Sequence, residues 1–80
     1  MHARTVWGFR GGDNALIESA LAATWPPDRF LFDITVAREH SFLLLRLSNG
    51  RAAASRSVFN PDSDTVGQIL RLVAELIEST

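Results

Sequence analysis

The sequence predicts an α+β fold, a two-layer sandwich in which two helices pack on one face of a four-stranded, mostly antiparallel sheet. Apolar residues recur at spacings of three and four over residues 14–25 and 66–77, which is typical of helices with one buried stripe. Between residues 5 and 59, four shorter stretches show the alternation of strands. The dipeptide Asn49-Gly50 marks a hairpin. The predicted order is β-α-β-β-β-α, in a single small domain over residues 1–80.

The composition indicates one core without cross-links. The chain has 80 residues, of which 46% are hydrophobic, and this size leaves room for only one core. It contains no cysteine, which excludes a disulfide scaffold and thiolate metal ligands. The longest apolar run, Phe42 to Leu45, is far shorter than the roughly 20 residues of a membrane span, and no signal peptide is visible. We therefore expect a cytoplasmic protein that does not act on membranes.

The charges nearly balance but are unevenly distributed. The net charge is −1, and all eight basic residues are arginines. Residues 29–59 hold five arginines against two acids, whereas residues 60–80 hold one arginine against four acids. The overall balance argues against a strongly basic nucleic-acid binder. The arginine usage fits either recognition of carboxylates or phosphates, or a GC-rich coding bias.

The first third of the chain predicts a strand followed by a helix. Side chains alternate over residues 5–10, and Gly11-Gly12 close the strand. Asp13 or Asn14 then caps a helix that ends at Pro26-Pro27, because proline lacks a backbone donor. The helix positions expected to face the core are Leu16, Ile17, Ala20, Leu21, Thr24 and Trp25.

Three further strands are predicted over residues 30–37, 42–48 and 51–59. Residues 38–41 form a four-residue loop between the first two of them. Asn49-Gly50 forms a two-residue turn between the last two, because both turn positions require a positive φ. We therefore expect an antiparallel meander.

The two connections fix registers that agree with each other. The turn pairs Leu45 with Ala54, and the loop pairs Ile34 with Leu45. Both registers place one apolar set on the same face, namely Phe32, Ile34, Val36, Leu43, Leu45, Leu47, Ala52 and Ala54. They also set Asp33 opposite Arg46 on the other face, which is a favourable cross-strand charge pair.

The last helix is predicted to begin with Asn60 or Ser63 as its cap and Pro61 in its first turn. Its core-facing stripe is Val66, Ile69, Leu70, Val73, Leu76 and Ile77. A right-handed crossover through the first helix makes the first two strands parallel. Both helices then pack on the sheet face that carries Ile34 and Leu45.

Helices on one face leave the other face of the sheet bare. Its predicted residues are Leu31, Asp33, Thr35, Ala37, Phe42, Leu44, Arg46, Arg51, Ala53, Ser55 and Ser57. Leu31, Phe42 and Leu44 are more apolar than a wet antiparallel face usually is, and an exposed apolar patch normally marks an interaction site. A chance scatter of apolar residues is the competing interpretation. The predicted protein-binding residues are Leu31, Asp33, Thr35, Phe42, Leu44, Arg46 and Arg51.

These features favour a small, non-enzymatic protein-binding module. It would act as an inhibitor, adaptor or regulatory protein through the bare face, or form a homodimer there. The alternative is single-stranded RNA binding by the same arginine-bearing face, which needs two or three exposed aromatic residues. Only Phe42 can be placed there, and Trp7 and Trp25 are expected in the core or at its rim. A small enzyme or enzyme subunit is the second alternative.

No catalytic, cofactor-binding or metal-binding residue is predicted. Gly8, Gly11 and Gly12 fit neither the dinucleotide spacing nor the P-loop spacing, and they indicate a tight turn between strand and helix. His2 and His40 are the only imidazoles, and the pattern fixes neither of them beside a carboxylate. The nucleophile elbow Gly-x-Ser-x-Gly is absent.

Overall fold

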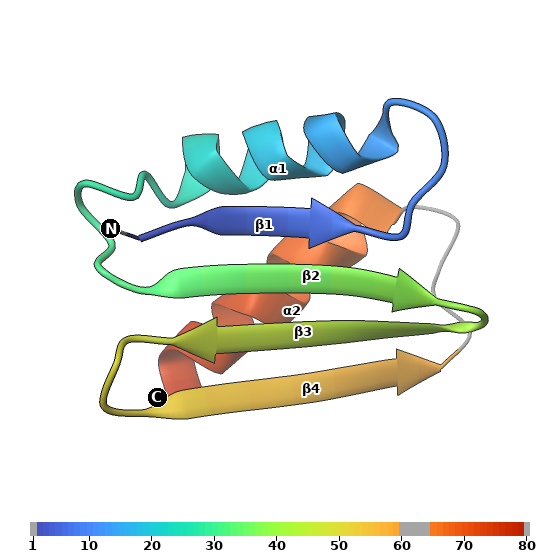
Figure 1. The fold of residues 1–80 in the computed structure, drawn as a ribbon. Coiled ribbons are helices and arrows are strands. Elements are labelled where there is room, and N and C mark those ends of the chain that lie inside the picture. Colours follow the sequence, from blue (N-terminus) through green and yellow to red (C-terminus); the bar gives the residue numbers. More distant parts are fainter. Residues whose placement is uncertain (1, 60–64, 80) are drawn as a thin grey trace.

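The helices and strands follow the predicted order β-α-β-β-β-α (Figure 1). The structure is a computed structural model, and it describes residues 2–59 and 65–79. The elements are β1 (Arg4–Trp7), α1 (Asp13–Thr24), β2 (Asp33–Glu39), β3 (Phe42–Ser48), β4 (Ala53–Phe59) and α2 (Thr65–Ser79). The predicted α+β class is confirmed. The cap predicted at Asn60 or Ser63 and the role of Pro61 lie outside the described residues.

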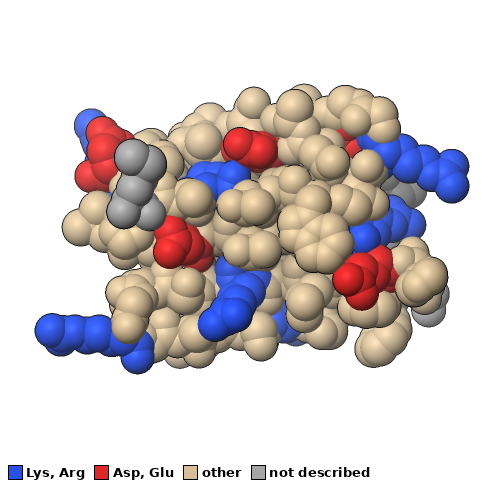
Figure 2. All heavy atoms as spheres, in the orientation of Figure 1, with Lys and Arg blue, Asp and Glu red and all other residues tan. Residues whose placement is uncertain are grey.

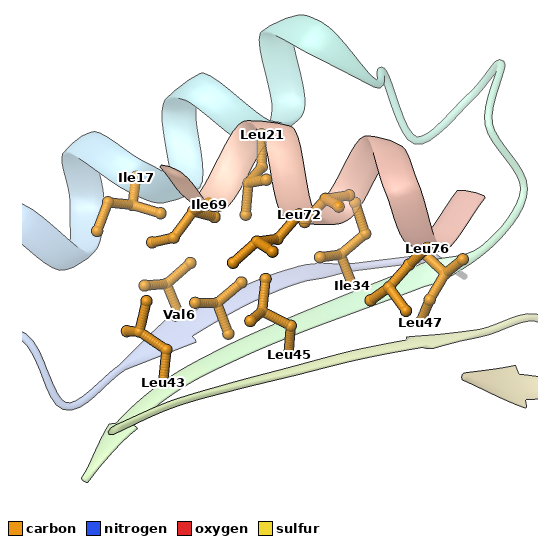
Figure 3. Packing of buried hydrophobic residues seen from close by; sticks show 12 residues of the cluster. Val6, Ile17, Leu21, Ile34, Leu43, Leu45, Leu47, Ile69, Leu72 and Leu76 are labelled. Carbon is orange, nitrogen blue, oxygen red and sulfur yellow. The ribbon is translucent and has the colours of Figure 1, made fainter. Parts of the chain in front are cut away.

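The described strands form one sheet in the order β1-β2-β3-β4. β1 and β2 run parallel, whereas the other two neighbouring pairs are antiparallel. The sheet is therefore mixed rather than fully antiparallel. Both helices lie on the same side of the strands, where α1 packs against β1 and α2 packs against β3 and β4 (Figure 3). We call this side the inner face of the sheet and the opposite side the outer face.

The core lies between the inner face and the two helices (Figure 3). Its buried side chains are Val6, Ile34, Val36, Leu43, Leu45 and Leu47 from the sheet and Ile17, Leu21, Ile69, Leu72, Val73 and Leu76 from the helices. Two of the predicted core positions of α1 are wrong, because Leu16 is 59% exposed and Thr24 is also exposed. Among the described elements, α1 packs only against β1 and α2, so a narrow stripe of it is covered.

Both hairpins are paired two residues away from the predicted register. The β2–β3 turn has two residues rather than four, and the β3–β4 loop has four residues rather than two. A shift of two keeps every strand residue on its predicted face. The predicted pairing of Asp33 with Arg46 is nevertheless wrong. Asp33 pairs with Ser48, and Arg46 pairs with Thr35.

Local turn chemistry accounts for both shifts. His40 takes a left-handed φ of 50°, which lets the first hairpin close in two residues. In the second hairpin, the Asn49 side-chain oxygen accepts hydrogen bonds from the backbone N–H groups of Arg51 (3.1 Å) and Ala52 (2.9 Å). These bonds hold a wider loop than Asn49-Gly50 alone predicts. Ala52, expected on the inner face, therefore lies outside the strand.

The second strand begins at Asp33 rather than at Phe30. The Pro26 carbonyl accepts hydrogen bonds from the N–H groups of Arg29 (3.0 Å) and Phe30 (2.9 Å), which curls the chain before the strand. This turn uses backbone groups that a strand would pair with its neighbour. Leu31, predicted on the strand, therefore lies in the connection and is 62% exposed.

A buried arginine holds this connection against β1. Arg4 is 6% exposed, and its guanidinium donates hydrogen bonds to four backbone carbonyl oxygens, those of Ala3, Trp25, Phe30 and Phe32. The Phe32 ring centroid lies 5.2 Å from the Arg4 Cζ atom. Burial lowers the pKa of Arg4, and the negative charge of Asp33 opposes this shift. Arginine still keeps its proton, so Arg4 remains a charged donor to carbonyls that lie outside the sheet.

β1 ends at Trp7 rather than Arg10, because Gly8 takes a left-handed φ of 92°. A Cβ atom at Gly8 would lie 2.1 Å from the carbonyl oxygen of Arg38 on β2, so that only glycine fits there. Gly11 also has a positive φ, 58°, but a Cβ atom there would meet nothing within 4 Å. The glycines therefore form the predicted tight turn between strand and helix.

α1 begins without the side-chain cap predicted at Asp13 or Asn14. Gly12 occupies the N-cap position, and no side chain accepts a capping hydrogen bond there. The Asn14 side-chain oxygen instead accepts a hydrogen bond of 3.0 Å from the Phe9 N–H. Asn14 therefore fixes the β1–α1 connection rather than the start of the helix.

We expect Arg4→Met to lower the free energy of unfolding by about 3 kcal/mol, because the part-buried carbonyl oxygens of Trp25 and Phe32 lose the guanidinium donor. Arg4→Lys should recover only part of this loss, since an ammonium group lacks the planar fork of arginine. Arg29→Met removes an exposed arginine and should cost less than about 0.5 kcal/mol. Denaturant unfolding followed by circular dichroism compares the three variants. Equal losses at Arg4 and Arg29 would contradict the structural role of Arg4.

Gly8→Ala should destabilise the fold by about 3 kcal/mol, because the added methyl group meets the Arg38 carbonyl in a strained backbone conformation. Gly11→Ala carries the strain alone and should cost about 1 kcal/mol. Thermal unfolding of the two variants under the same conditions measures the difference. If both variants melt at the same temperature, the close approach of Gly8 to β2 is not important for stability.

Candidate functional site

The outer face of the sheet is the candidate functional site, and neither described helix covers it. Figure 1 views this face with α2 behind the strands, and Figure 2 shows it as a largely uncharged surface with isolated charged groups. Its residues are Thr5 and Trp7 of β1, Asp33, Thr35, Ala37 and Glu39 of β2, Phe42, Leu44, Arg46 and Ser48 of β3, and Ala53, Ser55, Ser57 and Phe59 of β4.

One end of the outer face carries a cluster that we call the aromatic patch, defined as Trp7, Ala37, Phe42, Leu44 and Phe59. Phe59 is 70% exposed, Trp7 46% and Leu44 41%. The rings of Phe42 and Phe59 pack against each other with centroids 5.7 Å apart. Ala37 lies between Trp7 and Leu44 in one cross-strand row and is buried. Large apolar side chains are thus contiguous and in contact with water.

Most of the predicted protein-binding residues share this face. Those on it are Asp33, Thr35, Phe42, Leu44 and Arg46. Leu31 does not join them, because it precedes β2 at the end of the strand opposite to the aromatic patch. Arg51 lies in the β3–β4 loop, where its backbone N–H bonds to the Asn49 side chain. Both differences follow from the two turns described above.

The sequence prediction omitted Trp7 and Phe59, the two most exposed members of the aromatic patch. The alternation along β1 and along β4 is sufficient to place both residues on the outer face. Phe59 lies two residues beyond Ser57, and Trp7 lies two residues beyond Thr5, so each shares the outer face with a residue of its own strand. Trp7, expected in the core or at its rim, is nearly half exposed.

The rest of the outer face is polar, and one of its acids, Glu39, pairs with Phe42 at the patch end. Asp33 accepts a hydrogen bond of 2.7 Å from the Ala3 N–H, and its carboxylate lies 3.7 Å from His2 Nδ1. Arg46 is exposed and is the one cation among the outer-face residues of the described strands, whereas Asp33 and Glu39 are acids. The face therefore has no excess of positive charge.

A cavity of about 700 Å³ lies on the helix side of the sheet, near the start of α1. It is lined by Gly8, Phe9, Arg10, Asp13, Ile17, Arg38, His40, Thr65 and Val66. His40 and Asp13 both border it, but no hydrogen bond or ion pair joins them in the described part of the chain. His2 lies beside Asp33, at the opposite end of β2 from His40. The cavity is therefore lined by several charged groups, but His40 and Asp13 do not form an acid–base pair there.

Comparison of the chain with protein-family models, curated proteins and solved structures finds no match. Within residues 2–59 and 65–79, no helix is long and apolar enough to cross a membrane. The same residues contain no group of three side chains placed to hold a metal ion. The geometry of the outer face is therefore the basis of the functional argument.

Phe59→Thr should change the free energy of unfolding by less than about 1 kcal/mol, because the ring lies mostly in water. Leu43→Ala, at a fully buried position of the neighbouring strand, should cost about 3 kcal/mol. Denaturant unfolding at low protein concentration separates the two. A loss at Phe59 as large as the loss at Leu43 would show that Phe59 is buried in the monomer.

Proposed function

We infer that the chain is a non-enzymatic protein-binding module, an inhibitor, adaptor or regulatory protein that acts through the outer face of its sheet. The observation that carries this proposal is the joint exposure of Trp7, Leu44 and Phe59 beside Phe42. Contiguous apolar patches of this kind are uncommon on monomeric proteins unless they bind something. Tryptophan and arginine are also enriched among the residues that dominate binding energy, and Arg46 lies next to the patch.

The energetic reason is the hydrophobic effect. Burying apolar surface stabilises a complex by roughly 25 cal/mol per Å², before the entropy of association is subtracted. An aromatic side chain contributes most to this term because its area is large and its conformational freedom is small. The aromatic patch presents three rings and a leucine on a rigid sheet, so little ordering is needed on binding.

Single-stranded RNA binding is a second candidate, favoured by Trp7, Phe42 and Phe59 on one sheet face. Two observations weigh against it. The rings of Phe42 and Phe59 already pack on each other. The outer-face residues of the described strands offer only Arg46 to phosphates, and Asp33 and Glu39 would repel them. A protein surface is therefore the better match.

Leu44→Asp should weaken binding to a protein partner, while Leu16→Asp, which changes an even more exposed leucine on α1, should not. Each variant is immobilised and exposed to a lysate of the source cells, and the recovered protein is then titrated against both purified variants. We expect Leu44→Asp to weaken binding by about tenfold or more, about 1.4 kcal/mol, with an unchanged circular dichroism spectrum. Equal binding by both variants would contradict the proposal.

A parallel titration with single-stranded oligonucleotides at two salt concentrations separates the two candidates. Protein binding predicts no measurable oligonucleotide affinity in either buffer. Affinity that falls steeply with salt and disappears in Leu44→Asp would favour RNA instead.

A further inference from the structure

We propose that the partner of the outer face is a second copy of this chain, packed face to face about a two-fold axis that runs along the strands. This inference rests on the proposed function and names the occupant of the same surface. Two sheets that pack face to face keep their strands nearly aligned, about 30° apart. An axis along the strands, between β2 and β3, therefore reverses the strand order of one copy over the other.

One row of the outer face, which holds Trp7, Ala37 and Leu44 of the aromatic patch, complements itself under this rotation. One cross-strand row reads Trp7, Ala37, Leu44 and Ser57, which alternates large and small side chains. The reversed row sets Trp7 over the partner's Ser57. It likewise sets Leu44 over the partner's Ala37, whose small side chain is buried between those of its neighbours. Each large side chain of this row thus meets a small one, as close packing of two faces requires, while Phe42 in the neighbouring row lies over the partner's Glu39.

The charges of the next row are complementary as well. This row reads Thr5, Thr35, Arg46 and Ser55, so the same rotation brings Arg46 over the partner's Thr35. The partner's Asp33 lies two residues along the same strand, on the same face, within reach of the long arginine side chain. Arg46 forms no ion pair within the described part of its own chain. The symmetry makes the Arg46–Asp33 contact twice.

An axis across the strands would be the other two-fold arrangement of two stacked sheets. It would place the aromatic patch of each copy on the polar end of its partner, near Asp33 and Ser48. Asp33 of each copy would then lie over the partner's Glu39, so that two carboxylates face each other. The observed distribution therefore favours the axis along the strands.

The edge of β4 is the competing surface for self-association, because β4 is the last strand of the sheet. Its central Arg56 points to the inner face and forms an ion pair of 2.6 Å with Glu75 of α2. A strand added beside β4 would leave the aromatic patch in water. Association through this edge would therefore not respond to changes at Leu44.

The size of the outer face indicates a reversible dimer. Four strands about 4.8 Å apart, three of seven residues and one of four at about 3.4 Å per residue, give a flat footprint of roughly 400 Å². Standard interfaces bury about 800 Å² on each partner. We therefore expect a dissociation constant of about 1–100 µM rather than a permanent dimer.

Sedimentation of the purified chain from about 1 µM to about 500 µM tests the proposal. We expect a concentration-dependent dimer for the natural sequence and for Leu16→Asp, and a monomer for Leu44→Asp. Arg46→Asp and Asp33→Arg should each weaken the dimer about fivefold or more, and the double variant should restore it. A dimer that survives Leu44→Asp, or single charge variants that the double variant does not rescue, would overturn the proposed arrangement.

Cross-linking then tests the register directly, because the chain has no cysteine of its own. A mixture of Thr5→Cys and Ser55→Cys chains should be joined by a short bis-maleimide, because the rotation sets Thr5 over the partner's Ser55, whereas Ser55→Cys chains alone should not. Equal cross-linking in both samples would overturn the two-fold axis. A chain that stays monomeric at every concentration, yet binds another protein through Leu44, would refute self-association and leave the proposed function intact. Monomers without any such binding would refute both.

Discussion

A four-stranded sheet has two faces, and the helices of this structure cover only one of them. α1 and α2 both lie on the inner face, where the alternation along each strand places residues such as Val36 and Leu45. The same alternation turns the intervening residues to the outer face, whatever their chemical character. Leu44 is exposed for this reason, because a strand that buries Leu43 and Leu45 must turn Leu44 the other way.

The faces of the strands were predictable from the sequence, and the turns were not. Both hairpins differ from the expected register by two residues, a shift that returns each side chain to the same side of the sheet. The alternation of side chains with a period of two extends along the whole strand, so an error of two residues in the register does not change the predicted faces. Turn length depends on single residues instead, here the left-handed backbone of His40 and the side-chain oxygen of Asn49.

The candidate site was predictable in part for a related reason. Phe42, Leu44 and Arg46 were placed correctly because they belong to a strand with strong alternation. Trp7 was assigned to the core or its rim because a large apolar residue on a strand is usually buried there. Which side of β1 is covered depends on the packing of α1, and the sequence does not show this packing. Arg4 could not be anticipated at all. Three of the four carbonyl oxygens that surround it come from residues 25–32, about twenty to thirty positions away, and they assemble only in the folded chain.

The ion pair between Arg56 and Glu75 bears on how far assembly can proceed. Exposed ion pairs of this kind add little to stability. The pair matters because it places a charged side chain at the middle of the edge strand β4. An incoming strand at the edge of β4 would have to take the guanidinium out of water, which opposes the endless lateral growth that open sheet edges otherwise invite. In the proposed dimer, face-to-face pairing would bury the aromatic patch of both copies at once, so that the assembly would stop at two copies.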